Sequence, residues 1–278
     1  MQQMCHLAEV SRAGFYRHRL PAAVPREELV LRDAVQRVAL EWPAYGSRRI
    51  THELQQRGWT VNRKRVQRIM REDNLLCLRH RRFVVTTDSK HDLPVYPNLA
   101  ESMVLTSINQ LWRADITYIR LAEEFVYLAV ILDAYSRRVV GWALDRTLQD
   151  SLTLMALAMA LAQRGAPAGL VHHSDRGVQY ASRDYTRTLE EHGIRISMSR
   201  TGNPWDNAAC ESFMKTLKYE EVYRSEYRDL ADAYARIAEF LEVIYNQKRL
   251  HSALDYRSPA EFERSLLPRA PATGEVRV

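Results

Sequence analysis

Apolar residues recur at helical intervals in the first third of the chain. The pattern predicts three helices, over 26–40, over 47–57 and from 63 onward. Gly58 ends the second of these, and Thr60 and Asn62 offer side-chain oxygens that can cap the start of the third. Two short helices joined by a tight turn, with basic residues on the second, are typical of a helix-turn-helix module.

The pattern changes to that of strands after residue 105. The stretch FVYLAVILDA is an almost continuous apolar run, as expected of a strand buried on both faces of a sheet. Strands are predicted over 112–121, 125–134, 138–144, 169–173 and 194–198. Helices are predicted over about 150–165, 182–192, 206–219 and 230–245. This order of elements predicts a five-stranded mixed α/β sheet with flanking helices, and it matches the ribonuclease-H-like fold.

The composition excludes several classes of protein. Of the 278 residues, 46% are hydrophobic and 27% are charged, which rules out wholesale disorder. The three cysteines lie far apart without a Cys-x-x-Cys pair, so a disulfide scaffold is not expected. No apolar run approaches the ~20 residues that span a bilayer, and the first residues lack the layout of a signal peptide. We therefore expect a soluble cytoplasmic protein with no membrane partner.

Positive charge is concentrated in the first third of the chain. Residues 1–93 hold 18 Lys and Arg against 10 Asp and Glu, whereas the rest of the chain holds 22 against 24. Such a surface suits a phosphate backbone, although a solvated helix face can have the same composition. The residues that we expect to contact DNA in this region are Arg48, Arg49, Arg63, Lys64, Arg65 and Arg68.

Three acidic residues stand where the predicted fold can bring them together. Asp115 lies on the first strand in WRADITY, Asp175 follows the fourth strand in HHSDRG, and Glu211 lies on a later helix in NPWDNAACES. Three carboxylates around one point repel one another unless divalent cations neutralise them, and Mg²⁺ prefers such oxygen ligands. Two ions about 3.5–4 Å apart can serve in-line phosphoryl displacement. Asp133 and Asp206 are competing acids.

The spacing around Glu211 supports this interpretation. Thirty-five residues separate Asp175 from Glu211. Lys215 and Lys218 follow the glutamate by four and seven positions, on the same face of the helix. Cations in those positions can hold a DNA phosphate beside the metal ions.

In these and further motifs the chain resembles the B-frame (OrfB) transposases of the IS-three family of bacterial insertion sequences, which belong to the retroviral-integrase-like DDE superfamily. The matching stretches are YGSRRI (45–50), VNRKRVQRIM (61–70), WRADITYI (112–119), LDAYSRRVVGW (132–142), HSDRGVQYAS (173–182), NPWDNAACESFMKTLKYE (203–220) and YNQKRLHSALDYRSPAEF (245–262). The resemblance implies that Asp115, Asp175 and Glu211 form the catalytic, metal-binding triad, with two Mg²⁺ or Mn²⁺ ions. It makes Lys218 the basic residue that family members usually carry seven places after the glutamate.

The reaction that the resemblance implies is hydrolytic nicking at the 3′ ends of the element, followed by attack of the freed 3′-OH on a second phosphodiester. The implied partners are DNA, both the terminal inverted repeats and the target, and further copies of the chain on paired ends. The upstream-frame (OrfA) product is an implied partner or fusion, because the family's helix-turn-helix and leucine zipper are read from that frame. The expected place of action is the bacterial cytoplasm, on the nucleoid.

The hydrophobic pattern and the resemblance together predict five segments of the chain. They are a helical N-terminal remnant (1–25), a basic helix-turn-helix-like DNA-binding region (26–82), a linker (83–105), an integrase catalytic core with C-terminal helices (106–265) and a disordered tail (266–278).

Five other residues invite a functional interpretation beside a structural one. His172 and His173 suggest a metal site, but without further ligands at suitable spacing we expect packing or hydrogen bonding. Cys210 lacks the setting of a nucleophile and is expected in the core. Asn207 can orient the Glu211 carboxylate or touch DNA, or simply begin the helix. Arg249 can contact DNA or remain in solvent.

Two rival functions stay open at the level of the sequence. A metal nuclease of the same fold would hydrolyse nucleic acid without ever joining ends. A DNA-binding regulator or inactive remnant would keep the acids without using them. Strand transfer distinguishes the first rival from a transposase, and metal-dependent nicking distinguishes the second.

Overall fold

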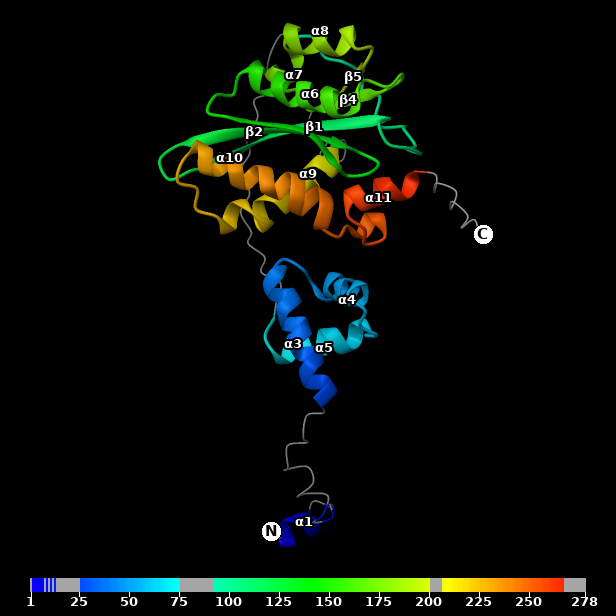
Figure 1. Cartoon of the computed structure of the whole chain (residues 1–278), viewed down its shortest axis with the longest axis vertical. Helices are drawn as coiled ribbons and strands as arrows, with labels where there is room; N and C mark the ends of the chain where they lie inside the picture. Colours follow the sequence, from blue (N-terminus) through cyan, green and yellow to red (C-terminus); the bar gives the residue numbers. More distant parts are fainter. Residues whose placement is uncertain are drawn as a thin grey trace, which may run out of the picture. The chain divides into compact units, whose positions relative to one another are not determined.

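The structure is a computed structural model that describes residues 2–7, 9, 11, 13, 26–75, 93–200 and 207–267. The chain divides into two compact units, Met1–Leu78 and Arg79–Val278, which are described separately (Figure 1). Most of the predicted disordered tail, from 268 onward, lies outside the described residues.

The first unit is helical, as predicted. After α1 (Gln2–Leu7) its elements are α3 (Arg26–Glu41), α4 (Ser47–Gln56) and α5 (Arg63–Glu72). Asn62 caps α5 by accepting a hydrogen bond from the backbone N–H of Arg65 at 2.9 Å. Each of the three longer helices turns an apolar stripe inward. The stripes are made by Leu31, Val35, Val38, Ile50, Leu54, Val66, Ile69 and Met70.

The second unit is built on a five-stranded sheet, and the predicted mixed α/β fold is confirmed. The strands are β1 (Leu111–Arg120), β2 (Phe125–Asp133), β3 (Val139–Asp145), β4 (Val171–Ser174) and β5 (Arg195–Met198). Their order across the sheet is β3-β2-β1-β4-β5. The first three strands are antiparallel neighbours, whereas β4 runs parallel to both β1 and β5.

Helices cover both faces of this sheet (Figure 1). One face is covered by α6 (Asp150–Arg164), α7 (Val178–Ala181) and α8 (Arg183–Glu191). The other is covered by α9 (Ala208–Glu220), α10 (Leu230–Ala238) and η3 (Glu239–Lys248). Short turns η2 (Val222–Arg224) and η4 (Ser252–Leu254) and a last helix, α11 (Pro259–Leu266), complete the unit. Because β2 lies in the interior of the sheet, its apolar run packs against both layers.

The residues of β1 alternate between these two layers. Ala114 packs in the cluster under α6 and α8, whereas Ile119 packs in the cluster under α9 and α10. Side chains two apart on a strand share a face, so Asp115 belongs to the α9 side. Gly141 on β3 allows α6 to approach closely, since a Cβ there would lie 2.2 Å from the carbonyl oxygen of Ala156.

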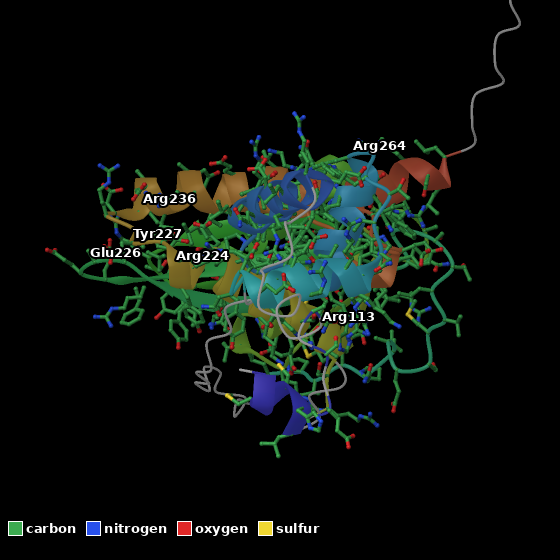
Figure 2. All side chains as sticks on the ribbon, turned by 90° about the horizontal axis from the view of Figure 1, so that it is seen from below. Arg113, Arg224, Glu226, Tyr227, Arg236 and Arg264 are labelled. Atoms are coloured by element: carbon green, nitrogen blue, oxygen red, sulfur yellow. The ribbon has the colours of Figure 1, made fainter. Side chains whose placement is uncertain are left out.

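The loop that joins β1 to β2 is tied to the chain ahead of α10. The backbone N–H of Ala122 donates to the carbonyl of Tyr227 at 3.1 Å. Tyr227, labelled in Figure 2, is itself buried and donates its hydroxyl to Glu221 at 3.0 Å. The β1–β2 hairpin is therefore held at its turn by the segment that precedes α10.

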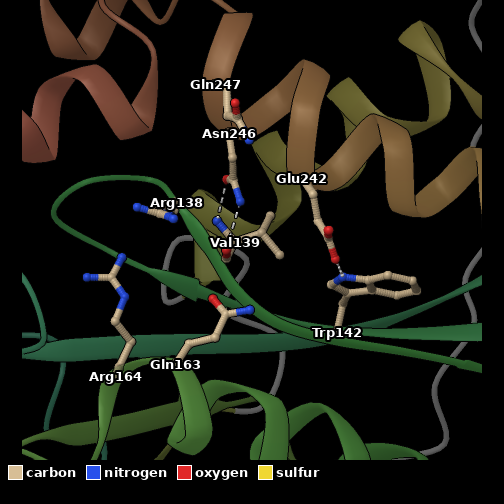
Figure 3. Close-up of a pocket in the computed structure, with 8 residues that line it drawn as sticks. All are labelled: Arg138, Val139, Trp142, Gln163, Arg164, Glu242, Asn246 and Gln247. Atoms are coloured by element: carbon tan, nitrogen blue, oxygen red, sulfur yellow. Dashed lines mark hydrogen bonds between the residues drawn. The ribbon is translucent and has the colours of Figure 1, made fainter.

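The C-terminal helices differ from the prediction of one helix over 230–245. The helix changes from α to π turns at Glu239, and the wider turns continue to Lys248. The amide of Asn246 accepts from the N–H of Val139 and donates to its carbonyl, both at 2.9 Å, which covers part of the β3 edge (Figure 3). A polar pocket of about 520 Å³ lies here, lined by Arg138, Val139, Trp142, Gln163, Arg164, Glu242, Asn246 and Gln247.

The described part of the predicted linker, 93–105, forms no strand and packs against the sheet of the second unit. The N–H of Leu99 donates to Ser197 Oγ at 2.8 Å, and Ala100 is buried against Leu111 and Val171. Its first residues, 83–92, lie outside the described part of the chain. No helix among the described residues is long and apolar enough to cross a bilayer.

Candidate functional site

The pairing of β1 with β4 places two of the predicted acids side by side. The parallel pairing ends with Arg113 opposite His173, because β4 stops one residue later. Continued by two residues, the same register sets Asp115 beside Asp175. Asp115 thus follows the point where β1 loses its β4 neighbour. The sequence signal for it was an acid inside the predicted first strand, in the motif WRADITY.

The third acid arrives on α9, which packs against β1. Cys210 and Phe213 are buried in the core beneath this helix, and the expectation that Cys210 is a core residue is confirmed. Asn207 lies at the start of α9 and donates its amide N–H to the carbonyl of Ala114 at 3.3 Å. This bond anchors the first turn of the helix, which carries the solvent-exposed Glu211, next to Asp115.

The electrostatics of Asp115 show that the three acids share one field. Burial, followed by the charge of Asp175 and that of Glu211, raises the pKa of Asp115 to about 7. The N–H of Ile116, which donates to the Asp115 carboxylate at 2.9 Å, and the charge of Lys218 act in the opposite direction. A carboxyl group in this position favours a nearby cation.

Lys218 reaches the same place from the second half of α9. Its ammonium lies 4.7 Å from the centre of the Tyr118 ring. Burial lowers its pKa, and the negative charge of Asp115 opposes that shift. Lys215, one turn earlier on the helix, is exposed. The two lysines therefore differ: one belongs to the acidic site and the other to the surrounding surface.

Gly177 is a residue of the site that sequence analysis did not single out. Its N–H donates to Asp175 Oδ1 at 2.9 Å. A Cβ at this position would lie 3.0 Å from the same oxygen, so only glycine leaves the carboxylate undisturbed. The signal was present in the motif SDRG, where the glycine stands two residues after the acid.

The donor set suits a hard divalent cation, although the side chains do not yet surround one. Among the described residues, no three His, Cys, Asp or Glu side chains are arranged to hold a metal ion as they stand. Carboxylate oxygens are nevertheless the ligands that a hard divalent cation prefers, and the charge of Asp175 acts on Asp115. Asn207 Oδ1 is buried there without a hydrogen-bond partner among the described residues.

The two histidines next to Asp175 are hydrogen-bonded parts of the sheet, as expected. His172 Nε2 lies 2.9 Å from the hydroxyl of Tyr185, and burial lowers the pKa of this imidazole to about 3. His173 lies between two serines, with Nδ1 2.8 Å from Ser197 Oγ and Nε2 3.0 Å from Ser199 Oγ. Both rings are thus engaged in holding β4, β5 and α8 together.

One of the two competing acids is a structural residue. Asp133 is fully buried, and its Oδ1 accepts from the N–H groups of Tyr135 and Ser136 at 2.9 and 2.8 Å. Its Oδ2 accepts from the N–H of Asn109 at 2.6 Å. Asp133 therefore shapes the turn between β2 and β3. Asp206 lies outside the described residues.

The predicted DNA contacts of the first unit divide into two groups. Arg48, Arg63 and Lys64 are exposed, the last two on the first turn of α5. The guanidinium of Arg49 lies 5.4 Å from the centre of the Tyr45 ring. Arg63 and Lys64 begin the second helix of the pair, and in helix-turn-helix proteins the first residues of the second helix contact base edges, whereas Arg48 lies on α4.

Arg65 and Arg68 are engaged inside the unit. Both guanidiniums bond Glu28 on α3, at 3.1 and 2.5 Å, and Arg68 also bonds Glu72 at 3.0 Å. Hydrogen bonds from Arg68, followed by Arg65, lower the pKa of Glu28. A DNA phosphate would have to compete with these carboxylates for the two arginines.

Arg249 is held inside the second unit by an ion pair. The residue is 3% exposed, and its guanidinium forms two bonds of 2.7 Å with the carboxylate of Glu220 on α9. It also lies 5.9 Å from the centre of the Tyr245 ring. A DNA phosphate would have to displace Glu220 to reach this guanidinium, and the predicted DNA contact of Arg249 stays a prediction.

Comparison with known proteins identifies the class first. The family described as Integrase core domain matches residues 106–204, and a second family of the same description matches 192–259. The family described as HTH-like domain matches residues 25–83, in agreement with the predicted helix-turn-helix-like region.

Relatives over nearly the whole chain then identify the family. The insertion element IS600 uncharacterized 31 kDa protein of Shigella sonnei is 40% identical over 268 residues, which cover 93% of this chain and 97% of that protein. The transposase InsF for insertion sequence IS3A of Escherichia coli (strain K12) is 35% identical over 269 residues, covering 95% and 93%. The chain belongs to this family of insertion-sequence transposases, and the resemblance found in its motifs is confirmed.

A solved structure is also similar to this chain. It is the simian T-cell lymphotropic virus intasome in complex with PP2A regulatory subunit B56 gamma, at 16% identity and a TM-score of 0.48, covering 88% of this chain and 78% of that chain.

Proposed function

We propose that this protein cleaves the 3′ ends of an insertion-sequence element and joins them to target DNA in a metal-dependent reaction. The observation that carries the proposal is the shared field of Asp115, Asp175 and Glu211 where β1, the end of β4 and α9 meet. Polynucleotidyl transfer of this kind uses metal ions held by carboxylate oxygens, and the site offers that donor set. Membership in the insertion-sequence family supports the same activity.

Each residue of the site has a distinct part in this proposal. The three carboxylates would hold two Mg²⁺ or Mn²⁺ ions, for which the exposed Glu211 has to turn toward Asp115. When bound, the ions activate the attacking oxygen and stabilise the leaving oxygen of an in-line displacement. Lys218 would hold a phosphate of the cleaved strand, and Lys215 would contact the flanking backbone.

The attacking group changes between the two steps, and no side chain is a nucleophile. Water attacks the phosphodiester in the cleavage step and leaves a free 3′-OH on the element. That 3′-OH attacks a target phosphodiester in the joining step and releases a target 3′-OH. The protein contributes position and charge, and therefore no covalent protein–DNA intermediate forms.

The direct test replaces the acids by their amides. Asp175→Asn and Glu211→Gln should abolish Mg²⁺-dependent cleavage of DNA that carries the terminal repeats. Glu190→Gln makes the same exchange at an exposed position on α8 and should leave cleavage unchanged. Undiminished cleavage by either triad variant would overturn the assignment.

Two further measurements separate the rival functions. A nuclease would release fragments, whereas a transposase also yields products in which the donor 3′ end is joined to target DNA. An inactive DNA-binding regulator would bind DNA equally with and without Mg²⁺ and would never nick it. The joined product with the wild-type protein, lost in Asp175→Asn, is the result that we expect.

The first unit supplies the wider DNA contacts in this proposal. Arg48, Arg63 and Lys64 would hold the terminal repeat, with further copies of the chain on the paired end. The upstream-frame product, as partner or fusion, would add end recognition. Mixing the protein with two terminal-repeat duplexes of different length should give a complex that contains both, detectable by gel mobility.

A further inference from the structure

Aromatic rings and a cation gather at the hairpin end of β1 and β2. Phe125 stands opposite Arg120 and Tyr118 stands opposite Tyr127 in the antiparallel register, so all four side chains share one face. We call these four residues the hairpin surface. Phe125 is 51% exposed, and its ring meets that of Tyr118 edge-on at 5.8 Å between centres.

The hairpin surface is connected to the acidic site through Lys218. Tyr118 follows Asp115 by three residues, about 10 Å along the strand. The two side chains lie on opposite faces of β1, but beyond Arg113 no β4 residue pairs with that edge of the strand. Lys218 reaches the edge from α9, and its ammonium lies 4.7 Å from the centre of the Tyr118 ring. A strand of nucleic acid can therefore pass from one face to the other along a cationic edge.

The chemistry of the hairpin surface fits unpaired nucleotides better than duplex. Exposed rings offer stacking to any base, but the bases of a duplex are already stacked on one another. Arg120 and Lys218 supply charge for the phosphates between stacked bases. The nearby Glu124 is paired with Arg146 at 3.0 Å, so its charge is already balanced.

We infer that the hairpin surface binds unpaired nucleotides of the DNA substrate next to the phosphate that is cut. One base would stack on the exposed ring of Phe125, beside Tyr118, and the adjoining phosphates would lie on Lys218 and Arg120. This inference rests on the proposed function, which it deepens by naming a DNA end with locally separated strands as the substrate. Two separated strands at the end would give the acids access to a single phosphodiester.

The experiment measures binding without cleavage, so it does not depend on the triad. The full chain is titrated in EDTA with two duplexes of identical sequence, one blunt and one with a short unpaired tail that carries 2-aminopurine. The wild-type protein should bind the tailed duplex about tenfold more tightly and quench the fluorescent base by stacking. Phe125→Ala should remove both effects and leave binding to the blunt duplex unchanged.

Two further variants keep the result interpretable. Tyr234→Ala removes another ring, also 51% exposed, that contacts Trp142 on β3 and should change neither signal. Phe125→Leu keeps apolar bulk at the hairpin without a flat ring, so it should still lose quenching even where alanine unfolds the hairpin.

Three results would overturn the inference. They are equal affinity of the wild-type protein for the two duplexes, full quenching with Phe125→Leu, and a change of oligomeric state with Phe125→Ala at unchanged DNA binding. The last would assign the hairpin surface to contact with a second copy of the chain. Failure of the proposed function is recognised separately, because it would show as cleavage that survives Asp175→Asn, whatever the tail does.

Discussion

Two acidic groups of the second unit lie in similar surroundings and have opposite partners. Glu263 on α11 is 8% exposed and accepts from Arg138, Arg164 and Ser136 at 2.6 to 2.8 Å. Asp115 is also withdrawn from water, but its charged neighbours include the acids Asp175 and Glu211, and its pKa rises to about 7. The Glu263 carboxylate is compensated by guanidiniums, whereas the Asp115 carboxylate lies among like charges.

The difference separates stability from activity in this protein. A buried carboxylate with two guanidiniums joins α11 to β3 and α6, so its loss should be felt in folding. A carboxylate among other carboxylates opposes folding, and such a group is expected where it serves the proposed reaction rather than stability. Exchange of each acid for its amide should therefore give opposite results in the two places.

The largest effect is expected at Asp115. Asp115→Asn removes a metal-ligand oxygen and should reduce cleavage by at least about 10²- to 10³-fold, as loss of an electrostatic group at a reacting centre does. The same change removes repulsion and should leave the free energy of unfolding equal or higher. Single-turnover cleavage and urea unfolding measure the two quantities. Asp184→Asn on the exposed surface of α8 is the control, and a less stable Asp115→Asn would contradict the comparison.

The opposite result is expected at Glu263. Glu263→Gln leaves Arg138 and Arg164 without their shared carboxylate and should lower the free energy of unfolding by about 3–5 kcal/mol. Cleavage per folded molecule should stay within a few-fold of wild type, because the residue lies on the β3 side of the sheet. Glu226→Gln, at an exposed position, serves as the matched exchange. Unchanged stability would show that the two guanidiniums find other partners.

The buried, neutral imidazole of His172 should make the stability of the protein depend on pH. Burial holds the pKa of His172 at about 3, against an ordinary value of 6.5. At a pH between these two values, His172 binds a proton in the unfolded chain but not in the folded chain. The free energy of unfolding should therefore fall as the pH drops from about 6.5 toward 3, by roughly 4 kcal/mol at most.

Urea unfolding of the wild-type protein and His172→Gln across that range tests this effect. The variant should lose part of the pH dependence and show a shallower decline. His192→Gln, which changes an exposed histidine, should decline like the wild type. Parallel curves for all three proteins would mean that His172 does not carry the dependence.

The smallest effect is expected in the first unit, where paired and unpaired cations stand on one helix. Within the described residues Lys64 has no ion pair, whereas Arg68 bonds Glu28 and Glu72. Lys64→Ala should lower the salt-dependence slope of DNA binding by about one, and Arg68→Ala should lower it less. Fluorescence anisotropy at several salt concentrations measures both slopes. A larger loss with Arg68→Ala would show that DNA displaces the two carboxylates.

Local signals in the sequence were sufficient where one segment decides the outcome. The apolar run of β2, the cap at Asn62 and the burial of Cys210 all follow from side chains and their near neighbours. The spacing of Asp175, Glu211 and Lys218 placed the lysine on the face of the glutamate, and it lies in the field of Asp115. The role of the three acids as a metal centre stays a prediction.

Signals that depend on distant partners could not be read in the same way. Arg249 looked like a DNA contact because its sequence neighbours are basic, yet its partner Glu220 stands 29 residues earlier. Asp133 resembled the other acids until its bonds to the β2–β3 turn and to Asn109 were visible. The change to π turns at Glu239 was also missed, because the apolar residues on either side of it keep nearly the same spacing as in a continuous α-helix.

By itself, the sequence determined the elements, their order and the family, since hydrophobic periodicity and short motifs are properties of contiguous residues. Only the tertiary structure decided which charges are compensated. Burial and pairing depend on groups that the chain brings together from far apart, as Glu263 does with Arg138 and Asp115 with Asp175. The two carboxylates therefore differ in their electrostatic energy, because Glu263 is paired with guanidiniums whereas Asp115 lies beside other carboxylates.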